Sequence, residues 1–299
     1  MHPSFPVSYI QPVFRPPSEG RSLIFQVTNG CSWNRCTYCD MYTDEQKKFR
    51  PRAQDDVLAE IRACAEQGIE PRRIFLADGD ALVLSMRRLR IILEEIRACF
   101  PDLQRVSSYC LPSNLKRKSD EDLQELEALG LKVIYVGAES GDDSVLRQID
   151  KGETYATTVQ ALMRARAAGI KTSVMILNGI GGKALSEQHA LASARLVNET
   201  QPDYLATLVL TFYSDRQRFD NGFDQRFEEL DTVELCREMR TLIDATDLDS
   251  TIFRSDHVSN HLVLKGVLGR DKARLLQQID EAVDYFRNHP EFEHDNSQY

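Results

Sequence analysis

The chain has 299 residues, of which 37 are lysine or arginine and 46 are aspartate or glutamate, so its formal net charge is −9. Hydrophobic residues make up 42% and charged residues 28%, which fits a globular protein with one large α/β barrel or two smaller domains and excludes disordered, collagen-like and disulfide-scaffold classes. The acidic balance disfavours a general electrostatic interaction with nucleic acid or with anionic lipid.

The N-terminal segment is predicted to be an extended arm. Residues 1–20 contain five of the eleven prolines, and proline and the residue before it disfavour both helix and central strand. The opening residues lack a basic stretch followed by an apolar core, and apolar runs such as 205–210 are far shorter than the roughly 20 residues of a membrane-spanning helix. We therefore expect a cytoplasmic protein without a membrane partner.

Six short apolar runs between about Arg21 and Leu210 alternate with amphipathic segments, at about 30 residues for each strand and helix. This alternation predicts an α/β fold, a partial (β/α)6 TIM-like barrel with parallel strands, over residues 21–212. Ser119 and the acidic residues after it predict a helix start. The predicted strands cover residues 22–28, 72–77, 104–109, 132–137, 171–177 and 203–210.

The pattern changes after Thr211. A polar and aromatic segment, TFYSDRQRFDNGFDQRF, comes first, and helices are predicted near 231–246 and 271–287. Residues 213–299 are therefore expected to form a small helical C-terminal extension that includes a loop on the substrate side. Because ligands of α/β barrels bind at the carboxyl ends of the strands, the polar segments that follow the six strands are expected to line one mouth.

Three of the seven cysteines, Cys31, Cys36 and Cys39, lie within nine residues directly after the first predicted strand. The odd number and the missing secretion signal disfavour a disulfide framework. Three thiolates are too few for a closed structural zinc site unless Cys64, Cys110 or a histidine supplies the fourth ligand. They suit a [4Fe–4S] cluster with one open iron, because iron–sulfur clusters take thiolate ligands.

The loop NGCSWNRCTYCDMY resembles the cluster loop of the radical S-adenosylmethionine (radical SAM) superfamily, in particular its branch of oxygen-independent coproporphyrinogen oxidase and elongator-type proteins. The resemblance covers about residues 22–210, and Tyr38 fills the aromatic position before the last cysteine. The spacing departs from the commonest pattern, because four residues (32–35) instead of three separate the first two cysteines.

The resemblance implies an enzyme whose [4Fe–4S] cluster and S-adenosylmethionine are its cofactors. An external electron donor of the flavodoxin or ferredoxin type would drive cleavage of S-adenosylmethionine to methionine and a 5′-deoxyadenosyl radical, which would act on an unknown substrate. Cys31, Cys36 and Cys39 would hold the cluster.

The resemblance also assigns cofactor contacts after the second and fourth strands. Asp78, Gly79 and Asp80 stand where the family receives the methionine ammonium group, with Asp80 as the side-chain contact; alternatively, the two aspartates only form a turn and cap the next helix. Glu139 and Ser140 resemble the family's pair that contacts the ribose or the ammonium group, and Lys151-Gly152 follows at the family's usual position.

Two further contacts come from later segments. Arg166 matches the arginine that pairs with the methionine carboxylate, whereas Arg164, two positions earlier on the same predicted helix, is expected to face solvent. Gly179, in NGIGG, resembles the glycine turn that passes close to the adenine. The same glycines are also compatible with phosphate binding, but the run lacks the ending of a P-loop.

Outside the resemblance, His257 and His261 have the i, i+4 spacing that would place both on one helical face. Without a glutamate between them, a surface or substrate-contacting role is favoured over metal binding. Two other functions stay open at this stage: a zinc-stabilised, non-catalytic binding protein on the same scaffold, and an ordinary barrel hydrolase or isomerase that binds phosphate through NGIGG.

Overall fold

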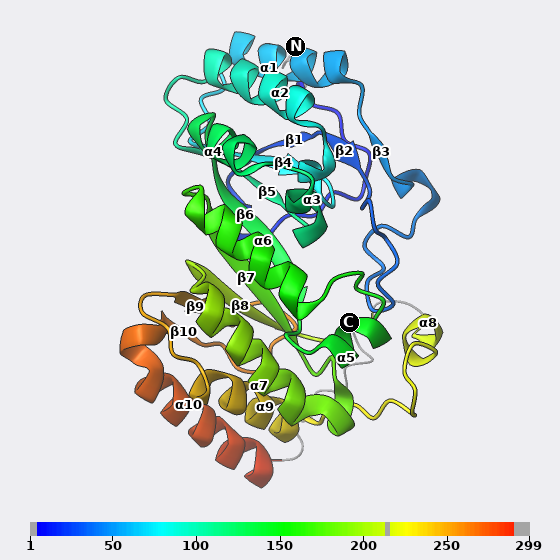
Figure 1. Ribbon diagram of the computed structural model, residues 1–299, viewed down its shortest axis with the longest axis vertical. Coiled ribbons are helices and arrows are strands. Elements are labelled where there is room, and N and C mark those ends of the chain that lie inside the picture. Colours follow the sequence, from blue (N-terminus) through cyan, green and yellow to red (C-terminus); the bar gives the residue numbers. More distant parts are fainter. Residues whose placement is uncertain (1–4, 213–215, 290–299) are drawn as a thin grey trace. The chain divides into compact units, whose positions relative to one another are not determined.

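One sheet of eight strands connects most of the described chain, which comprises residues 5–212 and 216–289 of a computed structural model. Its strands run in the order β1-β4-β5-β6-β7-β8-β9-β10 (Figure 1). The strand bounds are Leu23–Gln26 (β1), Arg73–Ala77 (β4), Arg105–Tyr109 (β5), Leu131–Glu139 (β6), Lys171–Asn178 (β7), Tyr204–Val209 (β8), Ile252–Arg254 (β9) and Lys265–Val267 (β10). A separate two-stranded ribbon joins Thr28–Asn29 (β2) to Arg50–Pro51 (β3).

The first six strands of the large sheet are the six strands predicted from sequence. The pairs β1–β4, β4–β5, β5–β6 and β7–β8 are parallel, which confirms the α/β class with parallel strands. The C-terminal extension differs from the prediction, because it adds β9 parallel to β8 and β10 antiparallel to β9. Strands of three residues are too short to show an alternating pattern in the sequence.

Helices follow most of the strands. They span Gln54–Glu66 (α1), Met86–Cys99 (α2), Pro112–Lys116 (α3), Asp120–Ala128 (α4), Asp143–Gln148 (α5), Tyr155–Ala167 (α6), Gly182–Thr200 (α7), Gln217–Asp220 (α8), Thr232–Asp244 (α9) and Leu268–Asn288 (α10). The last two confirm the helices predicted near 231–246 and 271–287. None of the described helices is long and apolar enough to cross a membrane.

The chain divides into two compact units. The first comprises Met1–Asn34, Met41–Val136 and Met163–Thr172, and the second comprises Arg35–Asp40, Gly137–Leu162 and Ser173–Tyr299.

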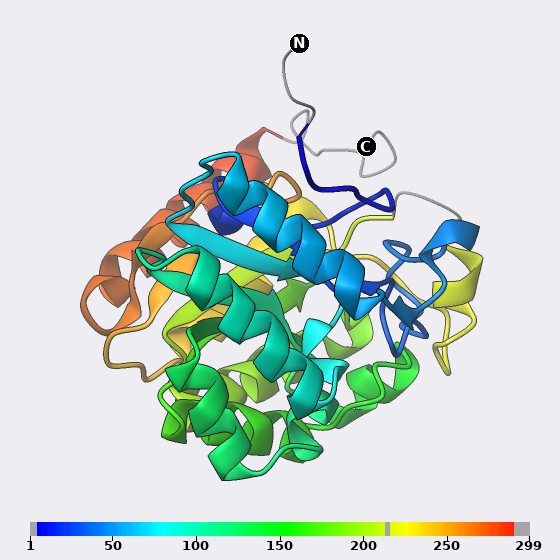
Figure 2. The ribbon, with the colours of Figure 1, turned by 90° about the horizontal axis from the view of Figure 1, so that it is seen from above.

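In the first unit, α1 packs against α2 and α2 against α4; Figures 1 and 2 show α1 and α2 side by side. The helix α4 begins as predicted, because Ser119 and Asp122 form a capping box at its start. The described part of the N-terminal arm forms no strand. Its Ile10 is held through backbone hydrogen bonds to the side chains of Gln26 and Lys47.

In the second unit, α7 packs against α9 and α9 against α10 (Figure 1). A buried apolar cluster lies beside the carboxyl ends of β7 and β8, and Tyr38 packs against it. Its members are Val145, Leu146, Ile149, Leu177, Ile180, Leu210, Phe219 and Phe227. The polar and aromatic segment after Thr211 therefore contributes to a core, although its residues 213–215 lie outside the described part of the chain.

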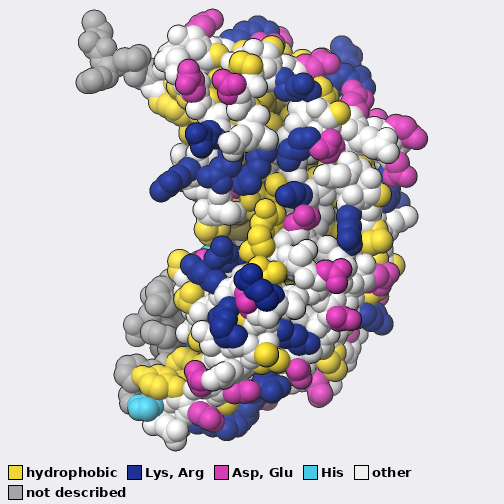
Figure 3. All heavy atoms as spheres, turned by 90° about the vertical axis from the view of Figure 1, so that its left-hand side faces the viewer, with side chains coloured by type: hydrophobic (Ala, Val, Ile, Leu, Met, Phe, Trp, Pro, Cys, Tyr) yellow, Lys and Arg dark blue, Asp and Glu magenta, His cyan; other side chains and the backbone are white. Residues whose placement is uncertain are grey.

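Lysine and arginine side chains gather into groups on the face shown in Figure 3, most clearly in the upper half of the view. These groups occur although the formal net charge is −9. The net charge therefore does not describe the local charge that a partner would meet on this face.

Candidate functional site

The turn after β4 holds the backbone on both sides of Cys31. The carboxylate of Asp78 accepts a hydrogen bond from the amide of Gly30 (3.1 Å), and that of Asp80 accepts one from the amide of Ser32 (2.8 Å). Between the two aspartates, a Cβ on Gly79 would lie 2.6 Å from the Cα of Cys31, so only glycine permits this approach. Three predicted cofactor residues thus surround the first predicted cluster ligand.

Asp80 is fully buried and makes further contacts. Its Oδ2 accepts hydrogen bonds from the hydroxyl of Ser32 and from Nδ2 of Asn114 (3.1 Å). Burial raises the pKa of Asp80, and the hydrogen bonds from Ser32 act in the opposite direction. The side chain makes no helix cap, so the alternative of a simple capping turn is wrong for Asp80. Its contact with the methionine ammonium group stays a prediction.

Asp78 forms a buried ion pair that the sequence did not indicate. Its carboxylate contacts the ammonium group of Lys47, and both side chains have no exposed surface. The same carboxylate oxygen accepts a hydrogen bond from Nε2 of Gln26 (3.0 Å). A charge pair without solvent is stabilising only while both partners are present, so the position of Asp78 depends on Lys47.

The extra residue between the first two cysteines coincides with a left-handed backbone position at Asn34, which has a φ of +46°. Asparagine tolerates this conformation better than other residues with a side chain, apart from aspartate. The side-chain amide of Asn34 donates to the carbonyl of Tyr42 (2.9 Å), which fixes the turn.

In the second unit, the segment with Cys36 and Cys39 is held by its backbone. The amide of Thr37 donates to the carbonyl of Ile149 (2.9 Å), at the end of α5. The guanidinium of Arg218, in α8, donates to the carbonyls of both Cys36 and Cys39, at 2.9 Å for Cys39. Arg218 was missed in the sequence, because it lies 179 residues from Cys39 in a segment without a recognised motif.

Tyr38 and Glu139 meet at one lysine. The ammonium group of Lys151 lies 3.2 Å from Oε1 of Glu139 and 3.4 Å from the hydroxyl of Tyr38. Burial lowers the pKa of Lys151, but the charge and the hydrogen bond of Glu139 together with the nearby Cys36 and Cys39 outweigh it, so that the pKa lies above its ordinary value. Glu139 has a φ of +64°, and a Cβ on Gly137 would lie 2.1 Å from its carboxylate. The predicted position Lys151 thus orients two predicted cofactor residues.

Ser140 and Gly179 belong to a buried polar network. The hydroxyl of Ser140 lies 2.8 Å from Nδ1 of His189 and has no exposed surface. The amide of Gly179 donates to Oε1 of Glu238 (2.6 Å). Neither His189 nor Glu238 was recognised in the sequence, although Glu238 has a signal there: it shares a helix face with apolar residues three positions before and four after it.

The two arginines at the end of α6 differ. Arg166 is exposed, and its role toward a carboxylate stays a prediction. The expectation that Arg164 faces solvent is wrong: it donates to Asp120 (2.7 Å) and to the carbonyls of Leu115 (2.8 Å) and Lys118 (2.6 Å). A long arginine side chain can reach the open end of a neighbouring helix, and these carbonyls belong to the last turn of α3 and to the residues directly after it.

His257 and His261 do not share a helical face, because residues 255–264 form bends and turns. Nδ1 of His257 lies 2.8 Å from the hydroxyl of Ser259. The spacing argument for a histidine pair on a helix is therefore wrong.

The three predicted cluster ligands are partly exposed thiols that form no disulfide. Within the described residues, no group of three or more His, Cys, Asp or Glu side chains is arranged to hold a metal ion. The donor chemistry suits iron–sulfur clusters, which take thiolate ligands, and does not suit magnesium or calcium, which prefer oxygen. The residues present therefore fit the cluster by type.

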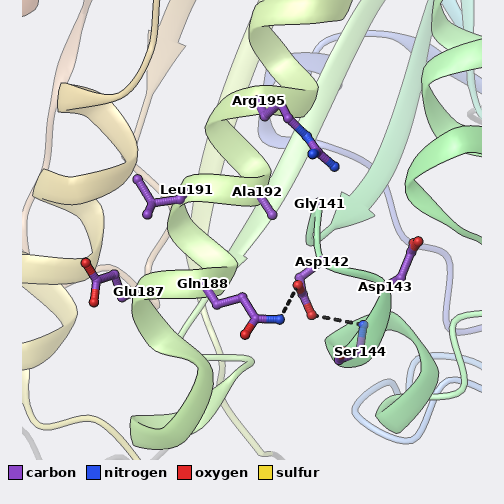
Figure 4. A pocket seen from close by; sticks show the side chains of 9 residues that line it. All are labelled: Gly141, Asp142, Asp143, Ser144, Glu187, Gln188, Leu191, Ala192 and Arg195. Atoms are coloured by element: carbon purple, nitrogen blue, oxygen red, sulfur yellow. Dashed lines mark hydrogen bonds between the residues drawn. The ribbon is translucent and has the colours of Figure 1, made fainter.

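An open pocket of about 630 Å³ lies between the N-terminus of α5 and the helix α7 (Figure 4). It is lined by Gly141, Asp142, Asp143, Ser144, Glu187, Gln188, Leu191, Ala192 and Arg195. The side chain of Gln188 donates to Asp142 (2.6 Å), which also caps α5 through the amide of Ser144 (2.9 Å). None of the predicted site residues lines this pocket.

Known proteins are similar in sequence to a part of the chain. The tRNA-2-methylthio-N(6)-dimethylallyladenosine synthase of Acidithiobacillus ferrooxidans is 25% identical over 225 residues, which are 72% of this chain and 44% of that protein. The chain thus spans less than half the length of this relative.

Solved structures share the fold. The radical S-adenosylmethionine methyltransferase TsrM from Kitasatospora setae has a TM-score of 0.54 at 23% identity, covering 73% of this chain and 40% of TsrM. Coproporphyrinogen III oxidase (HemN) from Escherichia coli has a TM-score of 0.53 at 15% identity, covering 75% and 52%.

The sequence profile of the radical SAM superfamily matches residues 25–197, more than half of the chain. Members of this superfamily are enzymes that use a [4Fe–4S] cluster and S-adenosylmethionine. The chain therefore belongs to the radical SAM superfamily.

Proposed function

We propose that the protein binds the [4Fe–4S] cluster through Cys31, Cys36 and Cys39 and reductively cleaves S-adenosylmethionine to a 5′-deoxyadenosyl radical. The radical would abstract a hydrogen atom from a substrate. The observation that carries the proposal is the fixed backbone around Cys31, which the turn Asp78-Gly79-Asp80 holds on both sides.

When bound, the cluster supplies the open iron that chelates the cofactor and the electron that cleaves it. The chain's own residues hold and orient. Glu139 is oriented by Lys151, so it can accept hydrogen bonds from hydroxyl or ammonium groups of the cofactor. Arg166 would offer a planar fork for the methionine carboxylate, and the turn at Gly179 would contact the adenine.

The substrate and the branch of the superfamily belong to the proposal as well. The fold similarity to HemN supports the coproporphyrinogen oxidase branch only at the level of the fold, whereas the sequence relatives include a methylthiotransferase-type enzyme whose name specifies tRNA.

The proposal also includes a division into an arm (1–20), a core (21–212) and a substrate-side extension (213–299). It further includes a cytoplasmic location and an electron donor of the flavodoxin or ferredoxin type. The negative net charge is the only observation that disfavours a nucleic-acid substrate.

The test is anaerobic reconstitution with iron and sulfide, followed by incubation with S-adenosylmethionine and dithionite. We expect about four irons per chain, acid-labile sulfide and release of 5′-deoxyadenosine. The triple variant Cys31→Ala, Cys36→Ala, Cys39→Ala should lose all three signals. Cys99→Ala, which removes a partly exposed thiol of α2, should keep them.

A triple variant that still released 5′-deoxyadenosine would contradict the proposal. One bound zinc without sulfide in the wild type would instead favour the alternative of a zinc-stabilised, non-catalytic binding protein. Membership in the radical SAM superfamily argues against this alternative.

A further inference from the structure

The helices α7 and α9 contact and position two turns that the proposed function assigns to S-adenosylmethionine. The first turn follows β6 and contains Glu139 and Ser140. The second follows β7 and contains Gly179. Both turns and both helices belong to the second unit.

The turn after β6 is pressed against α7. A Cβ on Gly141 would lie 2.2 Å from the carbonyl oxygen of Ala192, and the amide of Gly141 donates to the hydroxyl of Ser193 (2.9 Å). Figure 4 shows Gly141 beside α7, with the side chain of Gln188 directed toward Asp142. This turn has no space in which to move toward the helix.

His189 of α7 fixes Ser140 within the same turn. The hydroxyl of Ser140 accepts a hydrogen bond from the amide of Asp142 (3.0 Å), so its own hydrogen is available for Nδ1 of His189 at 2.8 Å. Nε2 of His189 lies 3.8 Å from Oε1 of Glu238. His189 and Glu238 are 1% and 3% exposed, so this arrangement is shielded from solvent.

Glu238 of α9 fixes the second turn. One carboxylate oxygen accepts the amide hydrogen of Gly179 (2.6 Å), and the other accepts the hydroxyl hydrogen of Ser186 (2.6 Å). Gly179 has a φ of +83°. A carboxylate is a strong partner for a backbone amide, because charge-assisted hydrogen bonds are about twice as strong as neutral ones.

We propose that Glu238 and His189 are positioning residues that lock the turns after β6 and β7 into the conformation that binds S-adenosylmethionine. The inference rests on the proposed function, since it needs these turns to contact the cofactor. It also changes the role of Ser140: its hydroxyl belongs to the buried network, and the turn offers its backbone and Glu139 to the ligand.

Glu238 lies outside residues 25–197, which match the superfamily profile. The C-terminal extension would therefore contribute to cofactor binding in this chain through one carboxylate, without touching the cofactor.

The test compares Glu238→Gln with Glu234→Gln, the same change one turn earlier on α9. Glu234 pairs with Lys183 near the surface and caps the helix, a role that glutamine also fulfils. Binding of S-adenosylmethionine to the reconstituted protein is measured by calorimetry without reductant, together with iron per chain. Glu238→Gln should bind about tenfold more weakly at unchanged iron content, and Glu234→Gln should bind like the wild type.

A second measurement needs no cofactor. Hydrogen exchange of the apoprotein should show about tenfold faster exchange at the amide of Gly179 in Glu238→Ala, with faster exchange in residues 139–142 in His189→Ala. Unchanged exchange at Gly179, or unchanged affinity in Glu238→Gln, would overturn the inference. Failure of the wild type to bind S-adenosylmethionine would overturn the proposed function itself and the inference with it.

Discussion

Gly79 lies so close to Cys31 that a methyl group in place of its hydrogen would come within 2.6 Å of the Cα and 2.7 Å of the Cβ of that cysteine. Neither atom is the end of a flexible side chain, so the backbone of Cys31 would have to move.

We expect Gly79→Ala to lose most of its cluster after reconstitution and to unfold with about 1–3 kcal/mol less free energy than the wild type. The measurements are iron per chain and urea unfolding. The control is Gly68→Ala: Gly68 has a φ of +73°, but its added Cβ would meet no atom within 4 Å. It should lose about 1 kcal/mol through backbone strain and keep its iron. Full iron content in Gly79→Ala would contradict the close approach.

The buried pair of Lys47 and Asp78 should show strong coupling. Because both side chains lack exposed surface, removing one charge leaves the other buried and unpaired, and Asp78→Asn should lower the free energy of unfolding by about 3–5 kcal/mol. Adding Lys47→Met should restore part of the loss. Urea unfolding of the two single variants and the double variant measures the coupling.

The control for this cycle is the pair of Lys183 and Glu234, whose side chains are 43% and 27% exposed. Breaking it should cost less than about 1 kcal/mol. Equal losses of unfolding free energy for the two pairs would show that burial does not determine the strength of the Lys47–Asp78 pair.

Arg218 should stabilise the bound cluster more than the fold. Arg218→Ala removes the hydrogen bonds to the carbonyls of Cys36 and Cys39 together with a positive charge near two predicted ligands. We expect several-fold faster loss of the cluster's absorbance in air and a more negative midpoint potential, since a nearby cation favours the reduced, more negative cluster. Gln217→Ala, an exposed neighbour in α8, should behave like the wild type; a variant of Arg218 that does so as well would remove the arginine from the site.

His189 should make stability depend on pH. Burial lowers the pKa of His189 below its ordinary value, and Glu238 and Asp142 oppose the effect without cancelling it. Between the lowered pKa and the ordinary value near 6.5, the unfolded chain therefore binds more protons than the folded chain. The contribution of His189 to stability is complete above this window and falls as the pH decreases through it, by at most about 1.4 kcal/mol per pH unit.

His189→Gln should consequently show a flatter dependence of the free energy of unfolding between pH 5 and pH 8, measured with urea at each pH. The pKa of the partly exposed His257 is also lowered by burial, so His257→Gln should flatten the curve less. A larger effect of His257→Gln would show that His257, and not His189, is the main cause of the pH dependence.

The repeated strands could be predicted because each one is a continuous apolar run followed by an amphipathic helix. Leu131–Glu139 and Tyr204–Val209 end within two residues of the predicted ends. The contacts of Asp80 with Ser32 could not be predicted, because they join residues 48 positions apart and depend on the pairing of β1 with β4. Arg164 was misplaced for the same reason: its partners lie on α3 and α4, and no local pattern indicates them.

The backbone contacts around the cysteines are made by groups of the polypeptide itself. Asp78 and Asp80 fix the amides next to Cys31, and Arg218 fixes the carbonyls of Cys36 and Cys39. The main-chain entropy of these ligand segments is therefore lost as part of folding. Such preorganisation of each segment lowers the ordering cost of cluster assembly.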